Sequence, residues 1–354
     1  MNTRPTPPAG PAAPRGEPIT DLVATALAAA SPVGHPAGPA TTSLADSTAD
    51  RTDGHPADRP RDDSGAALAR AADLRTRDLV DGFVHQAGPP PSRFAWVALG
   101  SHARGELHCA SDQDHALIWE TNRAAGSSYA HDLAAEVIAG LAKFGMRPCD
   151  GGFMADKWSL SLGDWVAQAR DRIEAPTPEA VVETDVFLDL RRLVGGLDIT
   201  PATEMLLAGA GSPRLMHGLA VAATSFATAL HPFGRLPHGP VDLKRTGLAP
   251  LVLLARLYGL DARSPAVGTR DRLAAAAAAG ILSEELVGRL GEGFGVLARL
   301  RLDAQIAQVL AGLPFSDVIV VDDLADDDRL ALRDALRAVR AAQSVTAVTF
   351  RTDL

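Results

Sequence analysis

The spacing of hydrophobic residues divides the chain into three parts, and the first part has no regular spacing. Residues 1–65 contain 11 of the 25 prolines and no aromatic residue. A segment of this composition cannot bury enough apolar surface to offset the entropy of ordering it, so we expect a disordered tail that is dispensable for folding. The patch at residues 22–30 predicts a transient helix at most, and order is expected to begin near Ala66.

The second part alternates between helical and strand-like spacing. Residues 66–91 predict a helical lead-in, because apolar side chains recur at helical intervals until a run of three prolines. Residues 92–200 then carry short apolar runs between polar turns, a pattern typical of a small α/β domain. The expected elements are strands at 94–99 and 115–119, a helix at 129–144, a short strand within 147–155, and a strand or helix at 181–190.

The third part, residues 201–354, is rich in leucine and alanine at helical spacing and predicts a helical bundle. Residues 318–321 are expected to be a brief apolar interruption within a loop. The fold class is therefore expected to be α+β, with a small α/β domain followed by a C-terminal helical domain. The expected helices lie at 213–229, 243–258, 269–279, 283–311 and 326–350.

Composition excludes several classes of protein. The net charge is −9 and the pI about 5.6, which argues against a general nucleic-acid binder with a basic surface. The two cysteines, Cys109 and Cys149, have no metal-ligand spacing. No apolar run approaches the length needed to cross a bilayer, and no secretory signal is visible. We expect a cytoplasmic protein without a membrane partner.

The stretch from residue 94 to residue 114 contains the residues expected to carry chemistry. An apolar run ends in Gly100-Ser101, and Asp112-Gln-Asp114 follows after a gap of ten residues. Glycine lets the backbone approach a phosphate closely, and a serine hydroxyl beside N–H groups at a helix N-terminus can bind a triphosphate. Alternate residues of a strand point to the same side, so Asp112 and Asp114 are expected to share a Mg²⁺ ion.

Each piece of this pattern is common by itself. An Asp-x-Asp is most often a pair of solvated turn residues, and a lone Gly-Ser is weaker still. The combination is more specific, because an apolar run precedes Gly100-Ser101 and another follows Asp114. It favours a metal site over a pair of loop caps.

This pattern resembles the DNA polymerase beta superfamily of nucleotidyltransferases, and especially bacterial PII uridylyltransferase. It is closer still to a nucleotidyltransferase family of signal-transduction proteins often fused to CBS and cyclic-nucleotide-binding domains. The resemblance covers roughly residues 66–354. Its further motifs are Pro90-Pro91, Phe94-Ala-Trp96, Arg104, Glu106, Cys149-x-Gly-Gly-x-Met-Ala155, Trp158, Trp165, Asp189-x-Arg191, Asp242-Leu-Lys-Arg-x-Gly247 and Leu300-Arg-Leu-x-x-Gln305. Ala103 departs from the family's usual glycine, and no departure removes a metal ligand.

The resemblance implies a third catalytic carboxylate on a later strand, which helps to activate the attacking hydroxyl. Asp189 is the first candidate and Asp150 the second, and either could instead be an ion pair or a strand-end cap. Arg104 is expected either to contact phosphate or to pair with Glu106.

Lys244 lies at an expected helix start. It either reaches across an interdomain cleft to the nucleotide or is a solvated helix end. Cys109 is expected to be a small packing residue.

The function expected from the motif and the resemblance is magnesium-dependent transfer of a nucleoside monophosphate from a nucleoside triphosphate to a hydroxyl. The resemblance implies a protein acceptor such as a PII-like regulator. Two alternatives stay open. One is a regulatory module that binds nucleotide without turnover, which a missing third carboxylate would favour. The other is transfer to a small molecule, which a deep and narrow acceptor pocket would favour.

Overall fold

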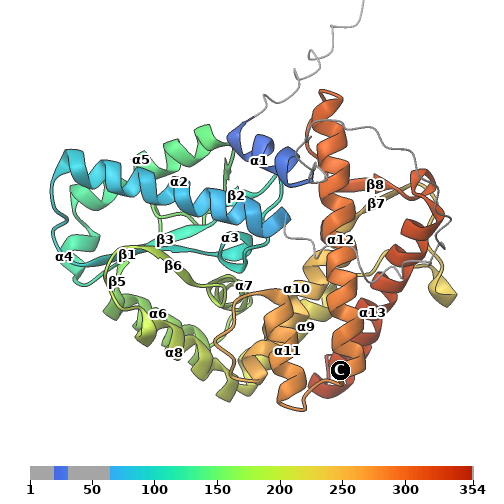
Figure 1. The fold of residues 1–354 in the computed structure, drawn as a ribbon. Helices are drawn as coiled ribbons and strands as arrows, with labels where there is room; N and C mark the ends of the chain where they lie inside the picture. The colour runs from blue at the N-terminus through green and yellow to red at the C-terminus, as the bar shows by residue number, and fades with distance from the viewer. Residues whose placement is uncertain (1–19, 31–63, 353–354) are drawn as a thin grey trace, which may run out of the picture.

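The structure is a computed structural model that describes residues 20–30 and 64–352. It has two lobes side by side, an N-terminal lobe (residues 64–211) and a helical lobe (residues 212–352), as Figure 1 shows. The N-terminal lobe contains α2 (Ser64–Ala87), β1 (Phe94–Ala98), α3 (Gly100–Arg104), β2 (Asp112–Gln113), β3 (His115–Trp119), α4 (Asn122–Ala125), α5 (Ser128–Phe144), β4 (Arg147–Pro148), β5 (Ser159–Ser161), α6 (Leu162–Glu174), α7 (Pro178–Phe187), β6 (Arg191–Val194) and α8 (Thr200–Ala208).

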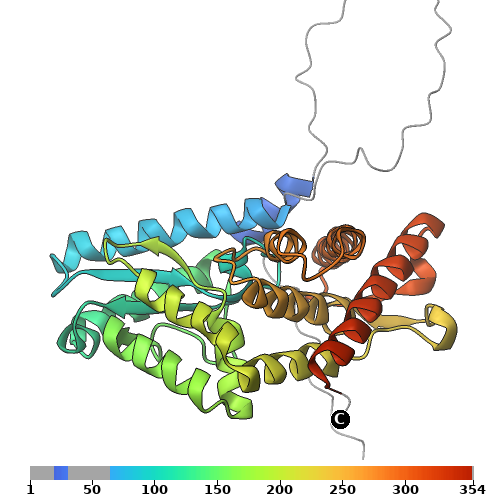
Figure 2. The same cartoon turned by 90° about the horizontal axis from the view of Figure 1, so that it is seen from below.

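A four-stranded sheet in the order β5-β3-β1-β6 forms the centre of the N-terminal lobe. β1 is antiparallel to both β3 and β6, and β5 is parallel to β3. Because successive side chains of a strand face opposite sides, β1 contributes side chains to two hydrophobic cores, one on each face of the sheet. Phe94, Trp96 and Ala98 pack with α2 and α5 on one face, and Ala95, Val97 and Leu99 pack with α6 and α8 on the other. The sheet is therefore a middle layer between two pairs of helices (Figure 2).

The helical lobe is a bundle with one small sheet. Its helices are α9 (Pro213–Ser225), α10 (Ala249–Asp261), α11 (Thr269–Ala278), α12 (Glu284–Leu310) and α13 (Asp326–Phe350). A π-helical turn at Lys244–Leu248 leads into α10. The residues expected to interrupt a loop form β8 (Val318–Val320) instead, because they pair with β7 (Pro240–Asp242), a partner about 78 residues earlier that local spacing cannot reveal.

The α+β fold class is confirmed, and most of the expected elements are present. α13 has the expected bounds, and Ser283 caps α12 by accepting a hydrogen bond from the backbone N–H of Leu286. The ambiguous run at 181–190 lies mostly in α7, a helix with Pro178 in its first turn and Thr177 as its N-cap. Over the described residues, no helix combines the length and apolar character needed to cross a bilayer.

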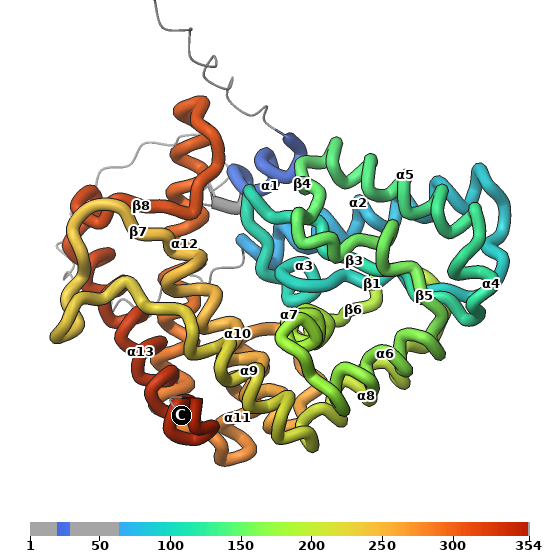
Figure 3. The backbone as a smooth tube through the Cα atoms, turned by 180° about the vertical axis from the view of Figure 1, so that it is seen from behind, coloured from blue at the N-terminus to red at the C-terminus, as the bar shows by residue number. Residues whose placement is uncertain are grey.

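The expectation of at most a transient helix at residues 22–30 is wrong. α1 (Asp21–Ala30) buries Leu22, Val23 and Ala26 completely or almost completely, in the same core as α2 and α5. It also contacts α12, so it bridges the two lobes, as seen from behind in Figure 3. Removing α1 would expose the surface of α2 that it covers, which argues against the prediction that all of residues 1–65 are dispensable for folding. The rest of that tail, residues 1–19 and 31–63, lies outside the described residues.

α8 places the end of the N-terminal lobe near residue 211 instead of residue 200. Its Ala202 and Leu206 are buried against α6 and the sheet, in the core that contains Trp165. α9 is the first helix to pack with α10 and α13. The helical lobe therefore begins with the serine that caps α9, Ser212.

Candidate active site

The turn after β1 brings Gly100 against Asp114. Leu99 donates its backbone N–H to the carbonyl of Asp114 (2.9 Å), which joins the end of β1 to the segment between β2 and β3. Gly100 has a positive φ of 55°, and a Cβ at this position would lie 2.6 Å from Oδ2 of Asp114. Only glycine leaves room for that carboxylate, so the Gly-Ser turn and the Asp-x-Asp segment fit together as one unit.

Asp112 in β2 and Asp114, the residue that directly follows this short strand, face one direction, as alternation along an extended backbone predicts. Asp112 and Asp114 both line a cavity, whereas Gln113 between them is completely buried on the opposite side. The Gln113 amide donates to the carbonyls of Met146 (2.8 Å) and Ile138 (3.1 Å), which fixes the orientation of this segment. The two carboxylates therefore face the same space.

Among the described residues, Asp112 has a single, long ion pair. Its side chain is 38% exposed, and the nearest cation is the Arg147 guanidinium at 3.9 Å. Burial raises the pKa of Asp112 above its ordinary value, Lys244 and Arg147 oppose this, and Asp114 and Asp150 raise it further. Asp150, the second candidate for a third carboxylate, thus lies near enough to act on Asp112. Within the described ranges, however, no group of three potential metal-binding side chains converges.

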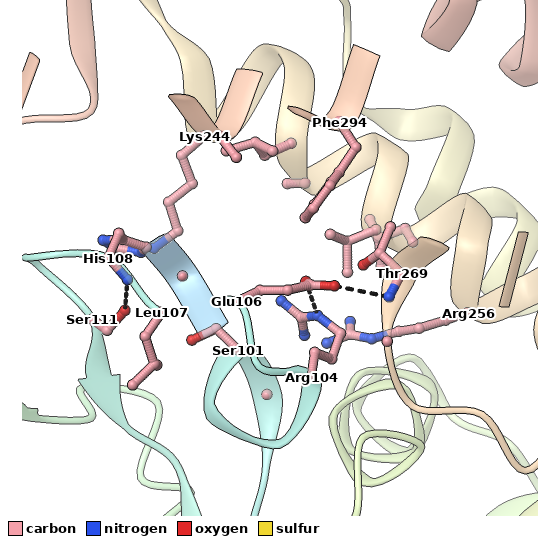
Figure 4. A pocket seen from close by; sticks show the side chains of 18 of the residues that line it. Ser101, Arg104, Glu106, Leu107, His108, Ser111, Lys244, Arg256, Thr269 and Phe294 are labelled. Atoms are coloured by element: carbon pink, nitrogen blue, oxygen red, sulfur yellow. Dashed lines mark hydrogen bonds and ion pairs between the residues drawn. The ribbon is translucent and has the colours of Figure 1, made fainter. Parts of the chain in front are cut away.

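The cavity is a cleft of about 650 Å³ between the lobes. Its first wall comes from the N-terminal lobe and contains Gly100, Ser101, Asp112 and Asp114. Its second wall comes from α9, α10, α12 and the segment before α11. Figure 4 shows His108, Ser111 and Lys244 at one end, Arg104, Arg256 and Thr269 at the other, and Ser101 between them. The apolar side chains in the second wall are Ala222, Phe226, Leu248, Val252, Leu253, Phe294 and Ala298.

Asp189 does not join Asp112 and Asp114. It lies in the turn between α7 and β6 and is completely buried. Its two oxygens are bound by three guanidinium groups, from Arg104, Arg256 and Arg272. Burial acts to raise the pKa of Asp189, but the three arginines outweigh it and hold the pKa well below its ordinary value. The structure therefore favours the ion-pair alternative, because no oxygen of this carboxylate is left for a metal or a proton.

Arg104 follows the alternative in which it pairs with acids. It is the last residue of α3, and its Nε donates to Glu106 at 2.6 Å while Nη1 binds Asp189. Glu106 in turn accepts the backbone N–H of Thr269 at 2.8 Å, which ties the N-terminal lobe to the start of α11. Arg104 reaches the cleft wall with its charge already compensated.

Lys244 reaches the cleft from the π-helical turn before α10. Among the described residues its side chain has no hydrogen bond or ion pair, and its charge acts on both Asp112 and His108. A π-helical turn widens the backbone locally and is frequent at functional sites. Lys244 thus lines the cleft, and its contact with a nucleotide stays a prediction. Cys109 is buried, as expected for a packing residue.

Sequence reasoning assigned no role to several side chains in or beside the cleft. These are His108, Asp185, Thr269, Arg301 and Gln305. Arg301 and Gln305 belong to a motif that supports the family resemblance, but their helical spacing alone does not show which lobe they face. The packing of α12 against the N-terminal lobe, which spacing does not reveal, places both side chains in or beside the cleft.

The sheet, the Gly-Ser turn and the paired aspartates facing an interlobe cleft define a nucleotidyltransferase-type site. Residues 60–179 match the family model described as "Putative nucleotidyltransferase DUF294", and residues 213–350 match "Putative nucleotidyltransferase substrate binding domain". The chain belongs to this nucleotidyltransferase family, and a nucleotide substrate follows from that membership. No curated protein matches the chain.

Proposed function

We propose that this protein is a magnesium-dependent nucleotidyltransferase that moves a nucleoside monophosphate from a nucleoside triphosphate to a hydroxyl acceptor. The observation that carries the proposal is the pair Asp112 and Asp114. They face one cleft beside Gly100-Ser101, and among the described residues their one ion pair is the 3.9 Å contact of Asp112 with Arg147. Weakly compensated carboxylates beside a glycine-serine turn are suited to a bound cation and its polyphosphate ligand.

The residues present fit a magnesium ion. Both side chains offer the oxygen ligands that Mg²⁺ prefers, and Gly100 keeps the space beside Oδ2 of Asp114 free of a Cβ. Asp112, Asp114 and Asp150 also accumulate negative charge that raises the pKa of Asp112, so a cation would relieve it. When bound, Mg²⁺ would neutralise charge on the transferred phosphoryl group and on the pyrophosphate.

The protein's own residues position the reactants. Ser101 at the start of α3 and Lys244 from the helical lobe hold the triphosphate between the two walls. The acceptor oxygen bonds to the α-phosphorus, the bond from that phosphorus to the α,β-bridging oxygen breaks, and its electron pair leaves with pyrophosphate. The acceptor's proton passes to water or to Asp150, a carboxylate close enough to Asp112 to raise its pKa.

The acceptor enters along the apolar part of the second wall, from α9, α10 and α12. Phe226, Val252 and Phe294 there can hold a flat or aliphatic group, such as the ring of a tyrosine side chain. This agrees with a protein acceptor of the PII-like class that the family resemblance implies. A small apolar alcohol would fit the same wall.

The test is incubation of the purified chain with each labelled nucleoside triphosphate, Mg²⁺, and either a PII-like protein or a cell lysate. We expect a labelled acceptor with one of the triphosphates, loss of labelling in EDTA, and loss in Asp112→Asn. Asp132→Asn, an exposed position on α5, is the matched control and should label normally. Absence of labelled product with every triphosphate and acceptor would contradict the proposal.

Asp189 favours a second candidate function, which is nucleotide binding without turnover. Three arginines neutralise this carboxylate, and the described residues hold no three-ligand acidic cluster. A regulatory module of this kind would bind nucleotide with micromolar affinity yet release no pyrophosphate. Measuring nucleotide binding beside pyrophosphate release distinguishes the two functions.

A further inference from the structure

Arg301 on α12 has a buried charge that its protein partners only partly satisfy. The residue is 7% exposed, and its Nε donates to Asp317 at 2.6 Å. Its Nη2 is buried and has no hydrogen-bond partner, and the side chain lines the cleft. A buried guanidinium nitrogen without a partner is costly, and a ligand with acceptor oxygens would remove that cost.

Gln305, one turn further along α12, fixes the protonation of the neighbouring His108. The Gln305 amide nitrogen donates to Asp317 (3.0 Å) and lies 3.4 Å from Nδ1 of His108. Nδ1 also accepts the backbone N–H of Ala110 (3.2 Å), so it carries no proton. Burial, Arg301 and Lys244 lower the pKa of His108 well below its ordinary value. His108 is therefore neutral and has its proton on Nε2, where it can act as a donor.

Arg301, His108 and Lys244 thus form one donor-rich corner of the cleft, which we call the basic corner. Arg301 and Lys244 both act electrostatically on His108, and Lys244 also acts on Asp112. The corner is therefore adjacent to the paired carboxylates. The nearby acid, Asp317, is already occupied by Arg301 and Gln305. Three donors that lie beside the proposed metal-binding pair, with Asp317 already occupied, fit a multiply charged oxyanion that also binds the metal.

We propose that the basic corner binds the β- and γ-phosphates of the nucleoside triphosphate, and the pyrophosphate after its release, so that the helical lobe holds the leaving group. This inference rests on the proposed function for the identity of the triphosphate. The position of the corner beside Asp112 distinguishes the leaving-group end from the far end of the cleft. There Arg104 and Arg256 are already neutralised by Glu106, Asp185 and Asp189.

Calorimetry on the full chain can distinguish binding of the leaving pyrophosphate from binding of the transferred nucleoside monophosphate. The measurement does not require turnover. The probes are inorganic pyrophosphate and the nucleoside monophosphate, each with Mg²⁺. We expect Arg301→Gln to weaken pyrophosphate binding about 10- to 100-fold and to change monophosphate binding less than about 2-fold. Arg299→Gln is the matched control on the same helix; its partners are Asp303 and Asp328, outside the cleft, and it should bind both probes normally.

Because Arg301→Gln could disturb the fold, Lys244→Gln provides a second test of the basic corner. Lys244 is exposed, and its replacement leaves no buried group unpaired. This substitution should weaken pyrophosphate binding about 10-fold at an unchanged melting temperature. Three outcomes would overturn the inference: no pyrophosphate binding by the wild-type chain, equal binding by wild type and both variants, or an equal loss of monophosphate binding. Pyrophosphate binding that depends on Arg301 in a chain without transferase activity would support the corner while refuting the proposed turnover.

Discussion

Two buried or half-buried aspartate regions lie near the same cleft and differ in what surrounds them. In β2, Asp112 has one cation at 3.9 Å, and burial together with the nearby Asp114 and Asp150 raises its pKa. In the turn before β6, Asp189 is completely buried, is bound by three arginines, and has a pKa held well below its ordinary value. Burial acts to raise the pKa in both regions. The difference is therefore made by the neighbouring charges.

The comparison distinguishes a carboxylate that stabilises the fold, Asp189, from carboxylates that are available to a ligand, Asp112 and Asp114. A buried carboxylate with three guanidinium partners is part of the folded structure, and a metal could bind it only by displacing them. Paired carboxylates with only one distant cation destabilise the ligand-free protein slightly and are stabilised when a cation binds. Substitutions in the two regions should consequently affect different measurements.

The largest expected effect is that of Asp112→Asn on nucleotidyl transfer. Asparagine keeps the size but supplies no anionic ligand, so the rate should fall on the order of 1,000-fold. The melting temperature should stay the same or rise slightly, because a repulsion with Asp114 and Asp150 is removed. Rates measured beside thermal melts test this, and a variant with near wild-type turnover would show that Asp112 is not a ligand.

Asp189→Asn should give the opposite pattern, in which the main effect is a loss of stability and not a direct loss of catalysis. Arg104, Arg256 and Arg272 would lose their shared counterion in a buried site, at a cost of about 3–5 kcal/mol in the free energy of unfolding. Urea denaturation measures this. Asp132→Asn serves as the surface control and should change the free energy by less than about 0.5 kcal/mol. A stable but inactive Asp189→Asn variant would reverse our assignment and make this residue catalytic.

Asp73 on α2 is an intermediate case with two partners. It accepts hydrogen bonds from His102 (2.8 Å) and Arg191 (2.8 and 3.0 Å). Burial acts to raise its pKa, but these bonds lower it from 3.8 to about 2. Since the folded pKa is below the unfolded one, this stabilisation is present above about pH 4 and is lost as the pH falls through 2, by about 2 kcal/mol. Urea denaturation from pH 5 to 2.5 should show a flatter profile in Asp73→Asn, and identical profiles would contradict the assignment.

Gly100→Ala should lower the free energy of unfolding by about 1 kcal/mol, less than Asp189→Asn or Asp73→Asn, because alanine rarely adopts a positive φ. Its methyl group would also push Oδ2 of Asp114 aside, so transfer should fall by more than the stability loss explains. The same substitution at Gly105, where φ is 73° and nothing lies within 4 Å of a Cβ, is the matched control. Equal loss of transfer in both variants would argue against a specific fit between Gly100 and Asp114.

Local patterns were sufficient to predict the long helices and the two central strands, because a helical or alternating period repeats within one segment. They also predicted the common direction of Asp112 and Asp114, which depends on strand alternation alone. The partners of Asp189 could not be predicted in this way, because Arg256 and Arg272 are 67 and 83 residues further along the chain. The short strands β5 and β7 could not be predicted for the same reason, because they are defined by pairing with strands that are distant in the sequence. α1 was underestimated because the average composition of 65 residues concealed three closely spaced apolar positions.

The cleft has one wall from each lobe, and this has a thermodynamic consequence for the whole chain. A ligand that contacts Ser101 on one wall and Arg301 on the other binds only when the lobes are docked. By linkage, the free energy that docking contributes to ligand affinity equals the free energy that the ligand contributes to docking. Changes at the α1–α12 contact, away from any phosphate, should therefore alter nucleotide affinity, and saturating nucleotide should slow hydrogen exchange at that contact.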